Sequence, residues 1–520
     1  MDVITKKQSC FNKISSLLAL LFFLFFMPSV LFSQEANGWL FVAEAPAYST
    51  WRPNEVIETQ EGALLVAFWD FQKDSHILKL TEDGELLSEQ VVSLEDTIVI
   101  ISRLFDLDSS SHEYIALALC RPESGDADAI MTMHFDDNLC VIQRNVVSCT
   151  DLEQSMFNMC VLKQSNDIII AITDWNYSHY FMKLDLDGDL LGWKDVEMDS
   201  LIHICNLFEI QGEEGNHFGM YAHTSSNGDA QMGVLVFDDS LELLRRAYFA
   251  PWQNEETGGN ICWSFMRDAI NSMIVPSPDN SGFLISSRLS ESLYTHDWHP
   301  LKNDRSTIIA KTDLDFAMLQ DYLLVGHLND TVEVPAFYKS IDCHPNPLYS
   351  KSTYQCTMQG LDNESLWPMA LTSLGLVVTK VNEDFNLIWK KRFLTEKEFY
   401  PFAITGTRDG GCAVTGMVYD QNDERRLNLF VFKIDAEGTV GISEIQEENM
   451  AFVYPNPAKE TIRVGSVEAK ETYVYNAMGQ CVMSFKGNEA NVKTLKEGVY
   501  LLKVTDTESR TQTIRLIVKK

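Results

Sequence analysis

The strongest constraint on this fold is a short pattern that occurs seven times between Ile77 and Val440. In each copy, two apolar runs flank a centre rich in Asp, Asn, Gly and Ser. Such residues tolerate the left-handed backbone of a tight turn, and alternating apolar flanks pair across it, so each copy predicts a β-hairpin. The turns begin at Thr81, Asp136, Asp185, Asp238, Asp313, Asn382 and Asp435.

One copy, FMKLDLDGDLLGW from Phe181 to Trp193, raises the alternative of a calcium loop. An EF-hand loop beginning at Asp185 needs glycine at its sixth position and glutamate at its twelfth. Here Gly188 is fourth and Val196 is twelfth. The spacing therefore excludes that calcium loop, and we interpret the aspartates as turn residues.

A strand-like run precedes every hairpin, which makes seven units of one inner strand and one outer hairpin. Such units suit a β-propeller, because a four-stranded blade buries its faces only against its neighbours. Residues 34–440 allow about 58 residues per unit, with two long members. We therefore predict an all-β chain with a propeller at residues 34–440, seven blades being favoured, and a strand from Trp39–Ala45 closing the ring. Six or eight blades, or a row of β-sandwiches, are the alternatives.

The formal net charge is −33 over 520 residues, and the first 33 residues hold three lysines against one aspartate, so the remainder carries −35. Such an acidic surface repels phosphate groups, which argues against nucleic-acid binding and against adhesion to anionic lipid. High solubility is the plainest interpretation of this charge.

The amino terminus has the pattern of an export signal. Its lysines precede an apolar run from Leu17 to Phe32, which is followed by the small residue Ser33 and then by a polar segment. The run contains Pro28 and is shorter than the roughly 20 residues needed to span a bilayer. We predict residues 1–33 to be a cleaved signal peptide, with an uncleaved anchor as the alternative.

Eleven cysteines are present, and ten remain once Cys10 is removed with the signal. An even number in an exported chain permits disulfides. The pairs best placed along the sequence are Cys343 with Cys356 and Cys140 with Cys149. The paired CxxC spacing of zinc ribbons is absent.

The last 70 residues, 451–520, follow a polar segment at residues 441–450 that we interpret as a linker. Six or seven short alternating strands with intervening turns predict a small antiparallel β-sandwich. Its marked segments are YPNPA at Tyr454–Ala458, YNAMGQ at Tyr475–Gln480, LKEGVYLLKV at Leu495–Val504 and the basic final strand IRLIVKK.

Together these segments resemble the C-terminal sorting domain of proteins exported by the type IX secretion system of the Bacteroidetes. The repeat around Val378–Phe393 also resembles propeller-like repeats of exported proteins from that phylum, a likeness of fold and not of activity. The alternative for the tail is an ordinary carbohydrate-binding or fibronectin-like sandwich. The resemblance identifies the sorting-motif residues as Tyr454, Pro455, Asn456, Pro457, Gly479, Gly498 and Tyr500.

The same resemblance implies a route and a location. The signal would carry the chain across the inner membrane, and the type IX machinery would then carry it across the outer membrane. The sorting domain would be cut off near residues 444–450. The mature protein would be released or anchored to lipopolysaccharide on the cell surface, its only expected contact with a membrane.

No catalytic motif is present: sialidase Asp-boxes, GxSxG, HExxH and Walker loops are all missing. We therefore favour a non-enzymatic propeller that binds a glycan, a peptide or an envelope partner, and we expect no cofactor. The alternative is a secreted hydrolase or lyase that acts on polysaccharide or glycoconjugate, with its acids hidden among the many carboxylates.

Long insertions at residues 249–267, 290–305 and 330–349 are expected to form loops on a rim, where propellers bind ligands. Aromatic side chains there could stack on sugar rings or grip a peptide, although they could equally pack their own loops. His296, Asp297, His299 and His344 have the chemistry to bind a metal, but we expect none. The candidate ligand-binding residues are Trp252, Trp263, Tyr294, Trp298 and His299.

Overall fold

The computed structural model describes most of the chain between residues 38 and 519. The described residues form β-strands and no helix. The predicted signal peptide, residues 1–33, lies outside them. The described ranges are 38–43, 50–70, 74–106, 113–124, 128–149, 156–162, 166–173, 178–196, 201–210, 216–226, 229–249, 252–253, 260–263, 273–292, 304–324, 331–336, 339–343, 351–361, 373–394, 397–419, 427–440 and 446–519.

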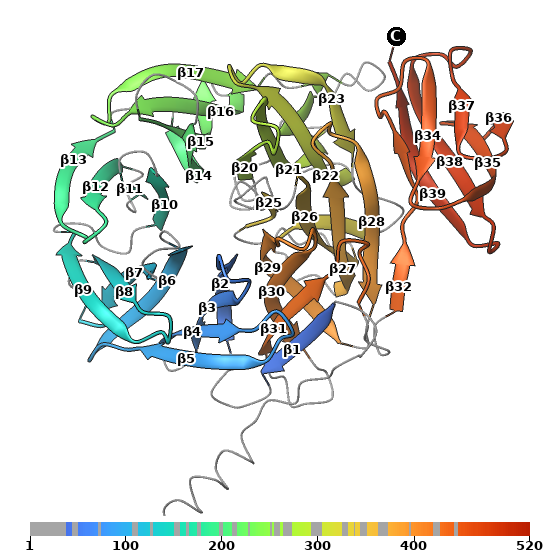
Figure 1. Ribbon diagram of the computed structural model, residues 1–520. Coiled ribbons are helices and arrows are strands. Elements are labelled where there is room, and N and C mark those ends of the chain that lie inside the picture. Colours follow the sequence, from blue (N-terminus) through green and yellow to red (C-terminus); the bar gives the residue numbers. More distant parts are fainter. Residues whose placement is uncertain are drawn as a thin grey trace, which may run out of the picture.

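Between Trp39 and Asn449 the described strands form seven antiparallel sheets around a common axis (Figure 1). Each sheet runs from an inner strand near the axis to an outer strand at the circumference. Central strands are buried on both faces, because each sheet packs against a neighbour on either side. The prediction of an all-β propeller is confirmed, and the sheets are called blades 1 to 7 in the order of their inner strands.

Blades 1 to 4 each contain four consecutive strands. Blade 1 comprises β2 (Thr50–Glu58), β3 (Leu64–Asp70), β4 (Ser75–Leu80) and β5 (Leu86–Val92). Blade 2 comprises β6 (Thr97–Asp106), β7 (Tyr114–Pro122), β8 (Ala129–Phe135) and β9 (Val141–Ser148). Blade 3 comprises β10 (Met156–Leu162), β11 (Asp167–Thr173), β12 (His179–Asp185) and β13 (Leu190–Asp195). Blade 4 comprises β14 (Leu201–Ile210), β15 (His217–Ser226), β16 (Asp229–Asp238) and β17 (Leu243–Phe249).

Blades 5 and 6 carry additional strands, and blade 7 borrows its outer strand from the start of the chain. Blade 5 comprises β18 (Trp252–Gln253), β19 (Asn260–Trp263), β20 (Met273–Pro276), β21 (Gly282–Ser292), β22 (Asp304–Asp313) and β23 (Met318–Leu324). Blade 6 comprises β24 (Thr331–Pro335), β25 (Ile341–Cys343), β26 (Thr353–Leu361), β27 (Ser373–Val381), β28 (Leu387–Leu394) and β32 (Gln446–Asn449). Blade 7 comprises β29 (Glu398–Gly406), β30 (Cys412–Tyr419), β31 (Leu427–Ile434) and β1 (Trp39–Ala43).

Strands β1 and β32 test two predictions made from the sequence, the strand that closes the ring and the linker at residues 441–450. β1 pairs antiparallel with β31, with Trp39 opposite Lys433, which confirms that this segment closes the ring. β32 falls within the segment expected to be a linker, yet it pairs with β28. A polar segment can still form a strand there, because the outer edge of β28 offers unpaired backbone groups.

Each repeat copy is a hairpin closed by a tight turn with one left-handed residue, as predicted. At Asp185 the backbone N–H donates to the carbonyl of Asp189 (3.0 Å), and the Asp185 carboxylate accepts from the Asp189 N–H (2.8 Å). The fourth residue of this turn, Gly188, has a φ of +87°. The corresponding left-handed residues of the other turns are Gly84, Leu139, Leu241, Phe316, Phe385 and Gly438.

The same turns also join neighbouring blades. In every one, the carbonyl of the second turn residue accepts a hydrogen bond from a side chain of the preceding blade. We call these seven contacts the turn latches. They are Trp39 to Glu82 (2.6 Å), Lys79 to Asp137 (3.0 Å), His134 to Leu186 (2.7 Å), Lys183 to Asp239 (3.0 Å), Arg245 to Leu314 (3.2 Å), Lys311 to Glu383 (3.5 Å) and Lys380 to Ala436 (2.8 Å).

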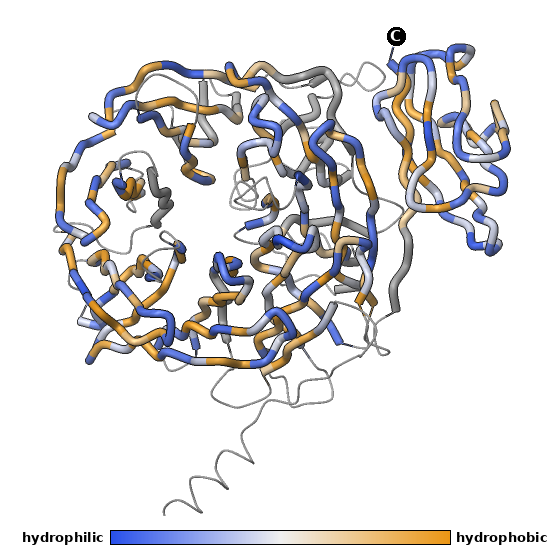
Figure 2. The backbone as a smooth tube through the Cα atoms, in the orientation of Figure 1, coloured by the Kyte–Doolittle hydropathy of each residue, from blue (hydrophilic) through white to orange (hydrophobic). Residues whose placement is uncertain are grey.

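The tail is a two-sheet sandwich beside blade 6 (Figure 1), which confirms the predicted fold of this region. Polar and apolar residues alternate along its strands (Figure 2), and a core around Val474, Leu502 and Leu516 fills the space between the sheets. One sheet contains β33 (Phe452–Tyr454), β34 (Thr461–Gly465) and β37 (Glu489–Asn491). The other contains β36 (Cys481–Phe485), β35 (Ala469–Asn476), β38 (Gly498–Asp506) and β39 (Thr511–Val518).

The two predicted disulfides are wrong, because none of the four cysteines forms a disulfide. Cys140 and Cys149 stand just beyond opposite ends of β9, and the nine extended steps between them separate their Cα atoms by roughly 30 Å. Cys343 lies opposite Thr353, so Cys356 is three residues further along the neighbouring strand. That offset exceeds the roughly 7 Å between Cα atoms that a disulfide can bridge.

Candidate functional site

The YPNP segment of the tail binds the last strand to the start of the domain. The buried Asn456 side chain donates through Nδ2 to the Arg515 carbonyl (2.9 Å) and accepts at Oδ1 from the Ile517 N–H (2.8 Å). Pro455 is exposed and Pro457 is half-buried, and the peptide bond before each is cis. The segment therefore organises the carboxy-terminal end of the chain.

The remaining motif residues of the tail shape its turns. The Tyr500 hydroxyl donates to the Lys496 carbonyl (2.8 Å), which ties the start of β38 to the preceding loop. Gly498 and Gly479 have φ values of +149° and +75°, where a side chain is unfavourable. Gly479 stands at an exposed turn with no atom within 4 Å of the place a Cβ would occupy.

One face of the tail sandwich exposes apolar side chains. Met478, Val482 and Leu501 are 78%, 44% and 42% exposed. Tyr475 is half-buried on the same sheet, opposite Leu501 in the pairing of β35 with β38. This face adjoins β36, which is an edge strand of its sheet.

The rim residues proposed from the sequence divide into two groups. Trp252 and Trp263 lie on β18 and β19, and Trp252 pairs with Ile261, two residues from Trp263. The structure thus brings their backbones together at the inner edge of blade 5. Tyr294, Trp298 and His299 lie outside the described residues, as do His296, Asp297 and His344.

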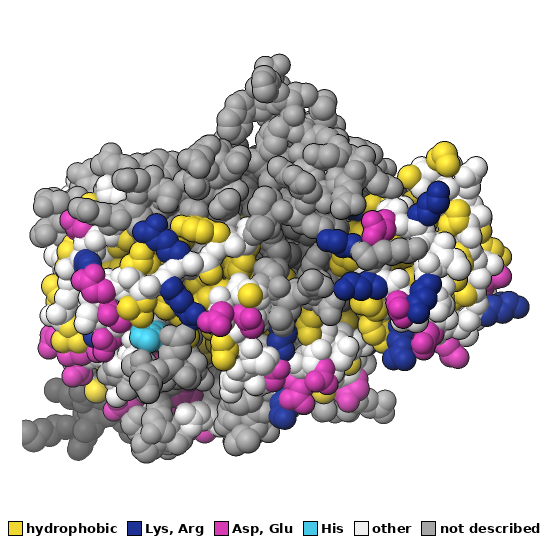
Figure 3. Space-filling model, turned by 90° about the horizontal axis from the view of Figure 1, so that it is seen from above, with side chains coloured by type: hydrophobic (Ala, Val, Ile, Leu, Met, Phe, Trp, Pro, Cys, Tyr) yellow, Lys and Arg dark blue, Asp and Glu magenta, His cyan; other side chains and the backbone are white. Residues whose placement is uncertain are grey.

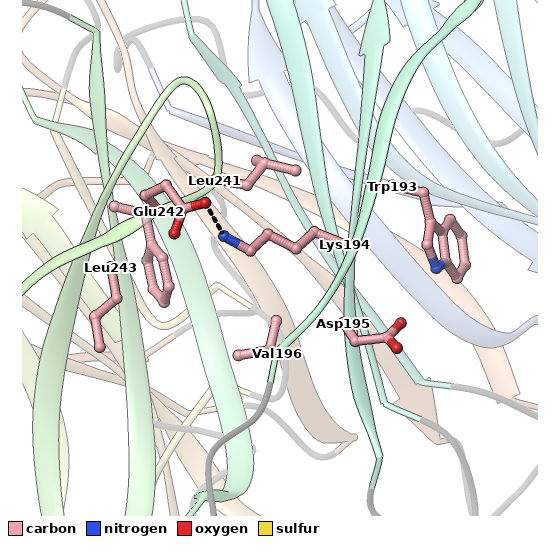
Figure 4. A pocket seen from close by; sticks show the side chains of 8 residues that line it. Trp193, Lys194, Asp195, Val196, Leu241, Glu242 and Leu243 are labelled. Atoms are coloured by element: carbon pink, nitrogen blue, oxygen red, sulfur yellow. Dashed lines mark ion pairs between the residues drawn. The ribbon is translucent and has the colours of Figure 1, made fainter.

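A groove of about 650 Å³ lies between the outer parts of blades 3 and 4 (Figure 4). Lys194 crosses it to form an ion pair with Glu242 (Nζ to Oε1, 2.6 Å), and Val196 and Leu243 provide apolar walls. Trp193 points away from that ion pair in Figure 4. Because the charges of Lys194 and Glu242 neutralise each other, which leaves Asp195 as the third charged lining residue, the groove resembles a contact between blades more than a reactive site.

Charged side chains of blades 1, 2 and 6 meet on the inner strands, together with a hydroxyl from blade 7. Glu55 accepts from Arg103 (Oε2 to Nη1, 2.9 Å) and lies 3.5 Å from Lys339 Nζ. Lys339 Nζ is also 2.9 Å from Asp342, whose carboxylate accepts from the Thr405 hydroxyl (3.0 Å). Burial alone would lower the pKa of Lys339, but the carboxylates of Asp342 and Glu55 raise it above its ordinary value. This network is neutral and paired within itself, so its evident role is to hold the first and last blades together.

Blade 1 contains a buried histidine between two carboxylates. His76 lies 2.9 Å from Glu89 through Nδ1 and 3.1 Å from Asp70 through Nε2, and it stacks on Phe68. Burial opposes protonation, but hydrogen bonds to Glu89 and Asp70 outweigh it and raise the pKa of His76. Because the carboxylates approach opposite sides of the ring, they cannot converge with it on one metal ion.

Other chemical groups in the described part of the chain add no reactive site. Burial raises the pKa of the thiols of Cys120, Cys149 and Cys412 to about 12, so they stay protonated at neutral pH. Among the described residues, no group of His, Cys, Asp and Glu is arranged to hold a metal ion. No helix of that part is long and apolar enough to cross a membrane.

Comparison with known proteins identifies the tail. Residues 452–519 match the family model of the secretion system C-terminal sorting domain, which covers the sandwich from β33 to β39. The tail is therefore a type IX sorting domain, and the recognition made from its motifs is confirmed. No curated protein matched the chain.

Solved structures similar to this chain include several propellers. Hydrazine synthase of Kuenenia stuttgartiensis has a TM-score of 0.42 and 9% identity, covering 72% of this chain and 94% of that one. The β-propeller domain of the trilobed protease from Pyrococcus furiosus has a TM-score of 0.38 and 8% identity, covering 76% and 98%. A protein of unknown function from Bacteroides caccae has a TM-score of 0.31 and 13% identity, covering 57% and 93%. The propeller assignment rests on the sheet topology described above.

The sequence contained two signals that motif reasoning missed. Lysine stands two residues before the first turn residue in five of the seven copies, and these lysines supply four of the turn latches. The second signal is a charge asymmetry: residues 34–450 hold 27 Lys and Arg against 66 Asp and Glu, whereas residues 451–520 hold 11 against 7. The tail is thus basic and the remainder strongly acidic. Figure 3 shows several basic side chains on the face where the propeller meets the tail.

Proposed function

We propose that this chain is exported across the outer membrane by the type IX system and acts outside the cell as a non-enzymatic binding propeller. The observation that carries the export step is the sandwich at residues 452–519, which matches the family model of the secretion system C-terminal sorting domain from β33 to β39. In this proposal residues 1–33 are the signal peptide, residues 34–440 the cargo and residues 451–520 the sorting domain of a Bacteroidetes protein. The mature protein is released or held by lipopolysaccharide at the surface.

The binding role is supported by the shape of blades 5 and 6. β18, β19 and β24 extend these blades beyond the four-stranded plan of blades 1 to 4. In blade 5, β19 and β20 pair with different parts of the 11-residue β21. The extension carries Trp252 and Trp263, whose residue type suits a sugar ring or a peptide. We therefore propose this edge of blade 5 as the ligand-binding region, with a glycan or peptide as its ligand.

The export step is tested by fractionating a bacterium that has a type IX system. The tagged chain is expected on the cell surface or in the medium, whereas a chain ending at Met450 is expected to stay in the periplasm. Asn456→Ala removes both hydrogen bonds to β39 and should also reduce export, and the exposed change Lys486→Ala serves as its control. Equal surface levels for the complete and truncated chains would contradict this step.

The binding step is tested by a glycan array and by pull-down of envelope fractions with purified propeller. Trp252→Ala and Trp263→Ala should weaken a ligand bound at blade 5 by at least about tenfold, since aromatic anchors often contribute more than 1 kcal/mol. Tyr248→Ala, an exposed aromatic on the outer strand of blade 4, is the matched control. Binding that neither tryptophan affects would place the ligand elsewhere.

A further inference from the structure

The sorting domain is bound to blade 6 through the backbone of β28. β32 pairs antiparallel with the outer edge of β28, which places Asn449 opposite Lys391 and Glu448 opposite Arg392. The Met450 N–H then donates to the Lys390 carbonyl (3.0 Å), which prolongs the same ladder.

Side chains of the tail complete the contact. Phe452 is 5% exposed and belongs to an apolar cluster with Val381 and Leu387 of blade 6, against which Phe385 also packs. On the tail side, the hydroxyl of Ser466 accepts from the Lys390 N–H (3.0 Å). Phe452 is therefore a residue of the sorting domain whose ring is buried with apolar residues of the propeller.

Charge favours the same arrangement. Residues 451–520 have four more basic than acidic residues, whereas residues 34–450 have 39 more acidic than basic ones. Two regions of opposite net charge attract one another over about a Debye length. The backbone ladder, the buried ring and the charge balance thus independently support a docked tail.

We propose that blade 6 is a docking surface for the chain's own sorting domain, and that docking protects residues 446–450 from proteolytic cleavage until the tail leaves the blade. A protease must bind a segment in its own active site, but the backbone of β32 is already paired with β28. Cleavage in this segment therefore tracks the small population in which β32 has detached. The proposal does not depend on the export route.

The test uses limited digestion of the complete chain with a glutamyl endopeptidase. The segment contains Glu447 and Glu448, and cleavage after either residue separates the propeller from the tail. Mass spectrometry measures the rate at these two sites, with a free peptide of residues 441–453 as the reference for an unprotected segment. The docked chain is expected to be cut at least about tenfold more slowly than the peptide.

Two variants undock the tail from opposite sides. Phe452→Asp places a charge in the apolar cluster. Phe385→Gly removes a ring from the propeller side at a left-handed position, φ +62°, where glycine is favourable and occurs in the turns at Gly84 and Gly438. Both variants should raise the rate of cleavage after Glu447 and Glu448 by about tenfold. Val482→Asp, on the exposed face of β36, is the matched control and should leave the rate unchanged.

Slow cleavage after Glu489 shows that the tail of each variant remains folded. If Phe452→Asp unfolds the tail, Phe385→Gly still tests whether undocking speeds cleavage after Glu447 and Glu448. Faster exchange of the amide hydrogens of residues 390–394 in Phe385→Gly would support the proposal. The proposal is overturned if the complete chain is cut as fast as the peptide. It is also overturned if Phe385→Gly, with a folded tail, is cut no faster than the natural chain.

Discussion

The propeller and the sorting domain contain the same hairpin turn but use it differently. In the tail, Asn476 accepts at Oδ1 from the N–H groups of Met478 and Gln480, and Gly479 takes the left-handed position. In blade 7, Asp435 accepts in the same way from the Thr439 N–H. Locally the two turns are equivalent.

Their surroundings differ. A Cβ on Gly438 would lie 3.0 Å from the ring of Trp389, and the Ala436 carbonyl accepts from both Lys380 (2.8 Å) and Trp389 (3.1 Å). A Cβ on Gly479 would meet nothing within 4 Å. One local turn thus serves as a joint between blades in the propeller and as an exposed tip in the tail. Four substitutions test how far this contrast extends.

The largest effect is expected from Lys339→Met, which removes a cation from the inner-strand network. The buried Glu55 and the half-buried Asp342 would remain with less compensation, and breaking a buried pair costs about 3–5 kcal/mol of unfolding free energy. Urea unfolding monitored by circular dichroism measures the loss. Arg463→Met, which breaks an exposed ion pair with Glu489 in the tail, is the control and should cause no measurable change. If Lys339→Met and Arg463→Met lowered the unfolding free energy equally, ion pairs of the propeller and of the tail would not differ in their contribution to stability.

The second-largest loss of stability is expected at a turn glycine of the propeller, Gly84, compared with the turn glycine of the tail, Gly479. Gly84→Ala places a Cβ 2.6 Å from the ring of Trp39 and also forces alanine into a left-handed backbone, so we expect a loss of about 3 kcal/mol. Gly479→Ala carries only the backbone cost of about 1 kcal/mol. Thermal and urea unfolding of both variants measure the difference. If Gly479→Ala lowered the unfolding free energy as much as Gly84→Ala, the turn at Gly479 would have close neighbours too, and the contrast between the two turns would be wrong.

A smaller loss of unfolding free energy is expected from Lys380→Met, which removes a turn latch. The carbonyls of Gly410 and Ala436 each lose a hydrogen bond from the lysine ammonium but keep one from the Tyr354 hydroxyl and the Trp389 indole, so the cost is about 1–2 kcal/mol. Lys503→Met, on the exposed side of β38, should change the unfolding free energy by no more than about 0.5 kcal/mol. If the two substitutions proved equal, the latch would not stabilise the ring.

The smallest effect is a pH dependence confined to the propeller, because the tail contains no histidine. The folded chain holds a proton on His76 more tightly than the unfolded chain does, so this contribution to stability is complete below pH 6.5. It is lost as the pH rises through the folded-state pKa. The unfolding free energy of the natural chain minus that of His76→Gln should therefore fall from pH 6 to pH 9. A difference that is constant over this range would contradict the assignment.

Local patterns predicted the hairpins, the closing strand and the sorting domain, because turn chemistry and alternation act within a few residues. The disulfide predictions failed for the opposite reason: closeness along the sequence at Cys140 and Cys149 becomes the length of a strand in space. The candidate ligand residues Trp252 and Trp263 remain a prediction, although the structure places their strands together. β32 was missed because its polar sequence has no strand pattern, and only the open edge of β28 makes it one.

The sequence alone determined that this chain repeats a hairpin and ends in a sorting domain, since both depend on residues close together along the chain. The tertiary structure decided which donors reach which turns, which charges meet on the inner strands, and that Phe452 of the tail is buried against blade 6. Those contacts join residues far apart in the sequence. Their partners become neighbours only when the ring closes and the tail packs beside it.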